Sequence, residues 1–225
     1  MTESRILLIR KSIAEAQRIE SEQHGLDAYL QARLPGLHHS IALPRDNAVP
    51  ALRLFVTRYI EQVPDFIEAL TDLTESAGVY NYAKRFLTIA EDYFFQPPEL
   101  VEANEGMRAL IDEAYLAHRL IEELNDRVIM TCGVPLSPMD MTLANIIVHD
   151  IIGEEFANQL DLAVHYSIEA LFETENFCKA ADFERYLKQH HKNGWKFAID
   201  KWPCLARDLK ITLDLDDNAP PPNVH

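Results

Sequence analysis

Proline placement is the feature that most constrains the fold of this chain. The twelve prolines fall in small groups, and they leave long intervals in which apolar residues recur every three or four positions. A proline inside a helix removes a hydrogen bond and clashes with the preceding turn, so helices are expected to run between these groups. The chain has only seven glycines, too few for the turns of a sandwich or barrel. These observations predict an all-α fold.

The intervals predict a single-domain helical bundle of about seven to eight helices. Gly25 is a candidate break in the first interval, and Pro64 is expected either to kink or to restart the second helix. Ser137 and Pro138 read as an N-cap and a first helical position. Gly153 is a candidate break in the longest proline-free span, together with the segments around residues 175–176 and 193–194. The predicted helical stretches are residues 3–33, 48–78, 79–95, 98–131 and 139–177, the last forming a long central helical region.

The 225 residues, of which 48% are hydrophobic, are enough to bury one sizeable core. We expect an all-α helical domain over residues 1–212. Residues 213–225 are acidic and then rich in proline, which predicts a flexible tail.

The charge balance is strongly negative. Asp and Glu number 36 against 21 Lys and Arg, so the formal net charge is −15. Nucleic acid and anionic membrane surfaces attract clustered positive charge, so neither is expected as a partner. No apolar run approaches the roughly 20 residues that cross a bilayer, and residues 1–11 lack the pattern of an export signal. Three widely spaced cysteines fit reduced thiols better than a disulfide framework. We therefore expect an acidic, soluble, cytoplasmic protein.

Three histidines lie inside strongly apolar helical stretches. His118 stands on a stripe of buried character and precedes Glu122 by one turn, so both side chains can converge on one point. His165 likewise precedes Glu169, and His149 is followed by Glu154. Imidazole nitrogen together with carboxylate oxygen is a donor set that suits zinc, manganese or iron.

A carboxylate-rich metal site is therefore one prediction, with Glu91 adding a ligand from another helix. The predicted metal ligands are His118, Glu122, His149, Glu154, His165, Glu169 and Glu91. Ferritin-like di-iron bundles use Glu-x-x-His motifs. This chain instead has two histidines each followed four residues later by glutamate, so it is not assigned to that family. The alternative for each histidine is structural, a core residue bonded to one neighbour or an ordinary ion pair on a solvated face.

Three functions remain open at this stage. The first is a metal-dependent, di-iron-like oxidoreductase acting on a small molecule. The second is a non-enzymatic adaptor or regulatory protein that binds another protein, or forms a homodimer through the aromatic segment at Trp195, Phe197 and Trp202. The third is a carrier of a small ligand held between helices.

Overall fold

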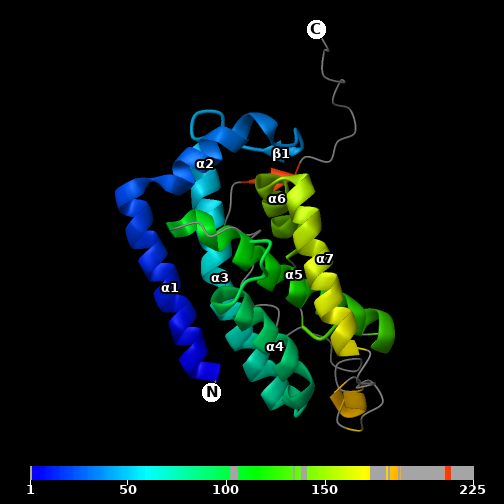
Figure 1. The fold of residues 1–225 in the computed structure, drawn as a ribbon. Helices are drawn as coiled ribbons and strands as arrows, with labels where there is room; N and C mark the ends of the chain where they lie inside the picture. Colours follow the sequence, from blue (N-terminus) through cyan, green and yellow to red (C-terminus); the bar gives the residue numbers. More distant parts are fainter. Residues whose placement is uncertain are drawn as a thin grey trace.

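The computed structural model describes residues 2–101, 106–133, 135–137, 141–172, 181, 183–186, 188 and 211–213. Its helices are α1 (Thr2–Gln23), α2 (Gly25–Arg33), α3 (Ala48–Ser76), α4 (Tyr80–Phe95), α5 (Gly106–Cys132), α6 (Thr142–Ile152) and α7 (Glu154–Phe172), with a 3-10 turn at Leu34–Gly36. A short antiparallel pair joins β1 (Ile41–Ala42) to β2 (Thr212–Leu213). The all-α fold is confirmed (Figure 1).

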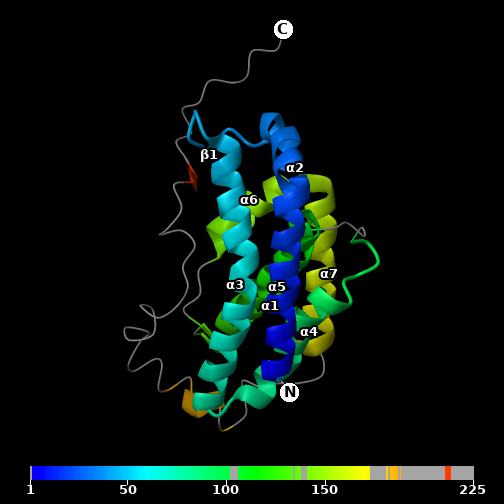
Figure 2. The ribbon, with the colours of Figure 1, turned by 90° about the vertical axis from the view of Figure 1, so that its left-hand side faces the viewer.

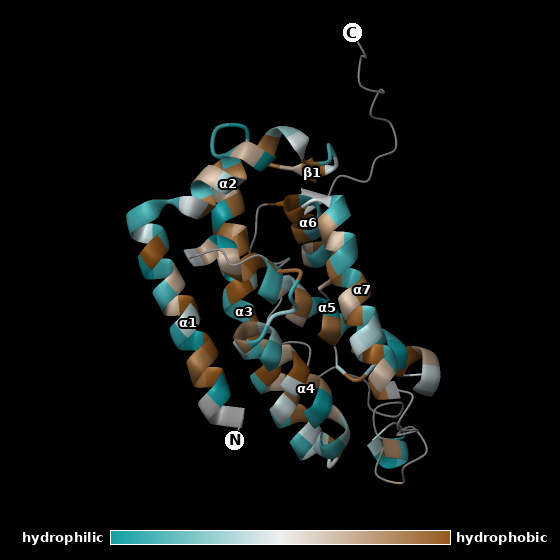
Figure 3. Ribbon diagram, in the orientation of Figure 1, coloured by the Kyte–Doolittle hydropathy of each residue, from teal (hydrophilic) through white to brown (hydrophobic). Residues whose placement is uncertain are grey.

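Helix α5 lies at the centre of the bundle. It packs against α1, α2, α3, α4, α6 and α7, so nearly every face of its first five turns is covered (Figure 1). The apolar stripe that the sequence indicated on this helix is buried throughout, from Met107 to Val128. The long central element is therefore α5, and not the 139–177 region that the proline-free span suggested. The outer helices show hydrophilic and hydrophobic residues in alternation, as amphipathic helices do (Figure 3).

Gly153 and Arg33 together stabilise the junction between α6 and α7. Gly153 ends α6 with φ +107°, a backbone conformation that side chains disfavour. Arg33 of α2 donates to the carbonyls of Ile151 (2.8 Å) and Asp150 (3.0 Å), and Tyr29 also donates to Ile151. These bonds supply donors for the last carbonyls of α6, which have no partner within the helix. The predicted break at Gly153 is confirmed.

The other predicted boundaries are correct in part. The break near Gly25 falls at His24, which has a positive φ, and Pro64 lies inside a continuous α3. Helix α5 begins at Gly106 and not near Pro98, because residues 98–101 form a turn and Gly106 has φ +69°. Helix α6 begins at Thr142, so Ser137 does not cap it.

The breaks predicted near residues 175–176 and 193–194, and the aromatic segment, lie outside the described residues. Leu213 belongs to β2, and residues 214–225 of the predicted tail also lie outside them. Within the described part of the chain, no helix combines the length and the apolar character needed to span a bilayer.

Candidate functional site

His118 lies at the centre of the bundle, with none of its surface exposed. Its Nε2 is 2.8 Å from the backbone oxygen of Tyr59. Because a carbonyl oxygen only accepts, Nε2 must bear the hydrogen and donate it. Nδ1 then has a lone pair and no hydrogen-bond partner among the described residues. Burial lowers the pKa of His118 to about 4, so the ring is neutral at physiological pH.

Glu122, one turn further along α5, accepts from donors of α5 and α6. Thr142 donates to Oε1 (2.7 Å), and Asn145 donates to Oε2 (2.6 Å). Arg119, on the same helix, also pairs with Oε2. Tyr59 donates its hydroxyl to the Oδ1 of Asn145 (2.6 Å), which connects α3 to this group. Both oxygens of the Glu122 carboxylate therefore already have partners.

Arg119 connects this group to α7. Its Nε donates to Oδ1 of Asp161 (2.9 Å), and the hydroxyl of Tyr115 donates to the same oxygen (3.0 Å). Burial alone would lower the pKa of Arg119, but the hydrogen bond and charge of Asp161 and the charge of Glu122 outweigh it and raise that pKa. Arg119 is thus a permanent cation between two carboxylates. We call Tyr59, Tyr115, His118, Arg119, Glu122, Asn145 and Asp161 the central polar cluster.

Three of the predicted metal ligands lie at the edge of this cluster or beyond it. The Nε2 of His149 is 3.9 Å from Oδ2 of Asp161 and 3.2 Å from the Oδ1 of Asn158. His165 pairs with Glu169 (3.1 Å) on a partly exposed part of α7.

The two remaining ligands lie apart from the cluster. Glu154 is exposed in the first turn of α7. Glu91, on α4, is buried and pairs with Arg5 of α1 (2.9 Å). Burial raises the pKa of Glu91 even though Arg5 favours the charged form.

Among the described residues, only one group of three His, Cys, Asp or Glu side chains brings its ligand atoms within 4.8 Å of one another. It consists of Glu20, His24 and Asp27, at the junction of α1 and α2. No three of the seven predicted ligands form such a group, although the metal site itself stays a prediction. In the central polar cluster, a metal ion at Glu122 would have to displace donors, including Arg119.

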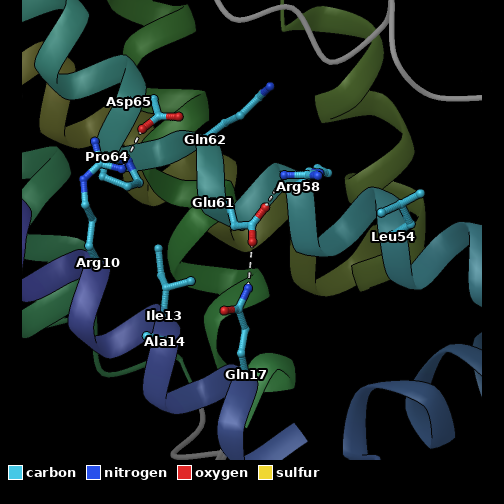
Figure 4. A pocket seen from close by; sticks show the side chains of 10 residues that line it. All are labelled: Arg10, Ile13, Ala14, Gln17, Leu54, Arg58, Glu61, Gln62, Pro64 and Asp65. Carbon is cyan, nitrogen blue, oxygen red and sulfur yellow. Dashed lines mark hydrogen bonds and ion pairs between the residues drawn. The ribbon is translucent and has the colours of Figure 1, made fainter. Parts of the chain in front are cut away.

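A surface groove lies between α1 and α3, which run side by side (Figure 2). Its volume is about 750 Å³. Glu61 of α3 bridges the two helices by accepting from Gln17 of α1 (2.7 Å) and from Arg58 (3.0 Å; Figure 4). The groove is lined by Arg10, Ile13, Ala14, Gln17, Leu54, Arg58, Glu61, Gln62, Pro64 and Asp65.

At the other end of the groove, Arg10 of α1 donates to Asp65 of α3 (2.7 Å; Figure 4). Arg10 also donates to Glu68 of α3 (2.9 Å). The groove therefore has one arginine and at least one carboxylate at each end. Oε1 of Gln62 is buried without a hydrogen-bond partner.

The groove is not predicted by the sequence. Its signal was present in a spacing of three and four residues: Arg10, Ala14 and Gln17 lie on one edge of α1. Leu54, Arg58, Glu61 and Asp65 follow the same spacing on α3. These two edges face each other because α1 packs against α3, which the spacing within each helix does not indicate.

Comparisons with protein-family models, with curated proteins and with solved structures find no match for this chain.

Proposed function

We propose that this protein binds a small polar molecule in the groove between α1 and α3. The observation that supports this proposal is the groove itself, whose volume of about 750 Å³ falls within the range of small-molecule sites. Clefts between the helices of bundles are common places for such sites. A second cavity, lined by apolar side chains of α4 and α5 among others, has about 10 Å³, room for roughly one water molecule.

The lining of the groove favours a molecule with both hydrogen-bond donors and acceptors. Arg58 is 61% exposed, and its guanidinium has five N–H donors in a fixed geometry. The carboxylate of Glu61 offers acceptor oxygens, and Leu54, which is 52% exposed, offers an apolar contact. Each end of the groove has an arginine paired with a carboxylate, so a molecule with charges of both signs fits it better than a purely anionic one.

Ala14 provides a direct test, because it is exposed and lines the groove. Ala14→Trp should fill the groove without entering the core. Ala32→Trp, at an exposed position of α2, is the matched control. Ligand-observed NMR with a library of amino acids and other polar fragments should yield binders of the wild-type protein. These binders should be lost in Ala14→Trp and retained in Ala32→Trp. Binders unaffected by Ala14→Trp, or no binders at all, would overturn the proposal.

A metal-dependent oxidoreductase is the second candidate function, and the group of Glu20, His24 and Asp27 is the observation that favours it. These side chains also have structural roles. Glu20 accepts from the backbone amides of Leu26 (2.8 Å) and Asp27 (3.3 Å). Metal analysis of untagged protein, with His24→Ala and His165→Ala compared, tests this candidate. If bound metal is lost only in His165→Ala, the metal site is at the ligands that the sequence predicts and not at Glu20, His24 and Asp27.

A further inference from the structure

Two large apolar side chains are exposed one turn apart on α7. Leu162 is 54% exposed and Tyr166 is 65% exposed. Residues four apart on a helix differ by about 40° around its axis, so these two side chains form one stripe. The opposite side of α7 packs against α5 and α6. We call Leu162, Tyr166 and the exposed acids Glu155 and Glu169 the outer face of α7.

A second exposed apolar pair on the protein differs in geometry and in charge. Leu7 (58%) and Leu8 (48%) are adjacent in α1, so they point about 100° apart and form no stripe. Basic residues are also close to them in the sequence, with Arg5 before and Arg10 after. The two pairs therefore provide a matched comparison of similar exposed apolar area.

Apart from histidines, every ionisable residue of α6 and α7 that is charged at neutral pH is an acid. The two helices contain five carboxylates, Asp150, Glu154, Glu155, Asp161 and Glu169, and no lysine or arginine. The nearby arginines are already engaged: Arg33 of α2 with backbone carbonyls at the end of α6, Arg119 of α5 with Asp161, and Arg127 of α5 with Glu123 (3.0 Å). His165 of α7 pairs with Glu169. An apolar stripe with an aromatic residue, bordered by acids, is complementary to a partner with apolar residues bordered by bases.

We propose that the outer face of α7 docks a positively charged amphipathic helix of another protein. Tyr166 and Leu162 contact the apolar side of that helix, and Glu155 and Glu169 pair with lysine or arginine at its edges. A tyrosine is among the residues that most often dominate binding energy at interfaces. This binding is independent of the groove between α1 and α3, which lies on different helices.

The test uses a labelled synthetic helical peptide of leucine and lysine, with leucines on one face, and measures its binding by fluorescence anisotropy. A second peptide, with glutamate in place of every lysine, serves as the charge control. The protein variants are the pair Leu162→Ser with Tyr166→Ser and, as the matched control, the pair Leu7→Ser with Leu8→Ser. Circular dichroism and urea unfolding establish that both variants fold.

We expect the basic peptide to bind the wild-type protein and the α1 variant with similar affinity, and the α7 variant about tenfold more weakly. The acidic peptide should not bind. Ala14→Trp should bind the basic peptide as the wild-type protein does, which separates this proposal from the groove. Equal affinity for the α7 and α1 variants, or no binding by the wild-type protein, would overturn the proposal. A dimer in light scattering that the α7 variant converts to a monomer would also overturn it, because the face would then bind a second copy.

Discussion

Glu113 and Glu122 are two glutamates on the same central helix with the same exposed fraction, 9%, and with very different surroundings. Glu122 pairs with Arg119 and accepts from Thr142 and Asn145. Oε2 of Glu113 is buried without a hydrogen-bond partner. Burial raises the pKa of Glu113 to about 7, with a smaller contribution from the charge of Asp112. At equal burial, one glutamate therefore has partners on both oxygens and the other has a buried oxygen without a hydrogen-bond partner.

Glu91 is intermediate between them. One of its oxygens pairs with Arg5, and the other is buried without a hydrogen-bond partner. The three residues differ in how many of their carboxylate oxygens have partners: both in Glu122, and only one in Glu91, where burial raises the pKa despite Arg5. Arginines therefore act as counter-charges for part of the negative excess of the chain.

Among the variants that test this comparison, Arg119→Met should lower the stability of the protein most. It would leave Glu122 and Asp161 without their shared cation, and removing one partner of a buried ion pair costs about 3–5 kcal/mol. We expect a loss near the lower end, about 3 kcal/mol, because Asp161 is 30% exposed. Urea unfolding at pH 7 measures it. Arg53→Met, which breaks a more exposed pair with Asp27, should cost less than about 1 kcal/mol. Equal losses in the two variants would contradict the central role of Arg119.

Glu113→Gln should stabilise the protein increasingly as the pH rises. The folded-state pKa of Glu113 is raised, so its contribution to stability is fully present below the unfolded value of 4.5 and is lost as the pH rises through about 7. Glutamine does not titrate. The stability difference between the variant and the wild-type protein should therefore grow by about 2–3 kcal/mol between pH 5 and pH 8. Urea unfolding at several pH values checks this, and a difference that does not vary with pH would show that Glu113 ionises normally.

His118→Gln should reduce the loss of stability that the protein undergoes between pH 7 and pH 5. The folded-state pKa of His118 is lowered, so its contribution is present above the unfolded value of 6.5 and is lost as the pH falls toward about 4. Between pH 7 and pH 5 the wild-type protein should lose about 2 kcal/mol through this histidine. Glutamine can still donate to the backbone oxygen of Tyr59 and does not titrate. If the variant loses as much stability on acidification as the wild-type protein, His118 is not the group responsible.

Glu91→Gln should have the smallest effect. The variant loses the ion pair with Arg5 but no longer has a carboxylate whose second oxygen is unpaired, so the two changes oppose each other. We expect a change within about 1 kcal/mol at pH 8. Thermal unfolding detects a difference of this size. A loss as large as that of Arg119→Met would mean that Glu91 is held more like Glu122 than the geometry indicates.

The burial of the central helix could be predicted from the sequence, but the contacts of its polar residues could not. The three- and four-residue spacing placed His118 and Asn125 on a buried stripe, and both are buried. Arg119 is on a neighbouring face of the same helix. Its pairing with Asp161 depends on where α7 packs, which no local pattern encodes. The sequence therefore predicted Glu122 and Glu91 as ligands of a metal ion without indicating that each pairs with an arginine.

The groove and the start of α5 also show that local sequence patterns predict some features, whereas others depend on packing. The polar edges of α1 and α3 are visible in the sequence, whereas their facing each other results from packing. Pro98 predicted a helix start because proline favours the first helical position. In the structure the residues after it form a turn, and α5 begins only at Gly106. The prolines correctly predicted that a helix ends near Phe95, but they wrongly predicted that the next helix begins at Pro98.

The most direct test of the contrast between the two glutamates is the free energy of unfolding of Glu122→Gln and Glu113→Gln, each compared with the wild-type protein by urea unfolding at pH 8. We predict changes of opposite sign. Glu122→Gln should destabilise the protein by about 2–3 kcal/mol, because it removes the carboxylate that Arg119 pairs with and places an amide among donors. Glu113→Gln should stabilise it. Changes of the same sign in both variants would contradict the conclusion that arginine and polar partners, rather than burial, separate these two glutamates.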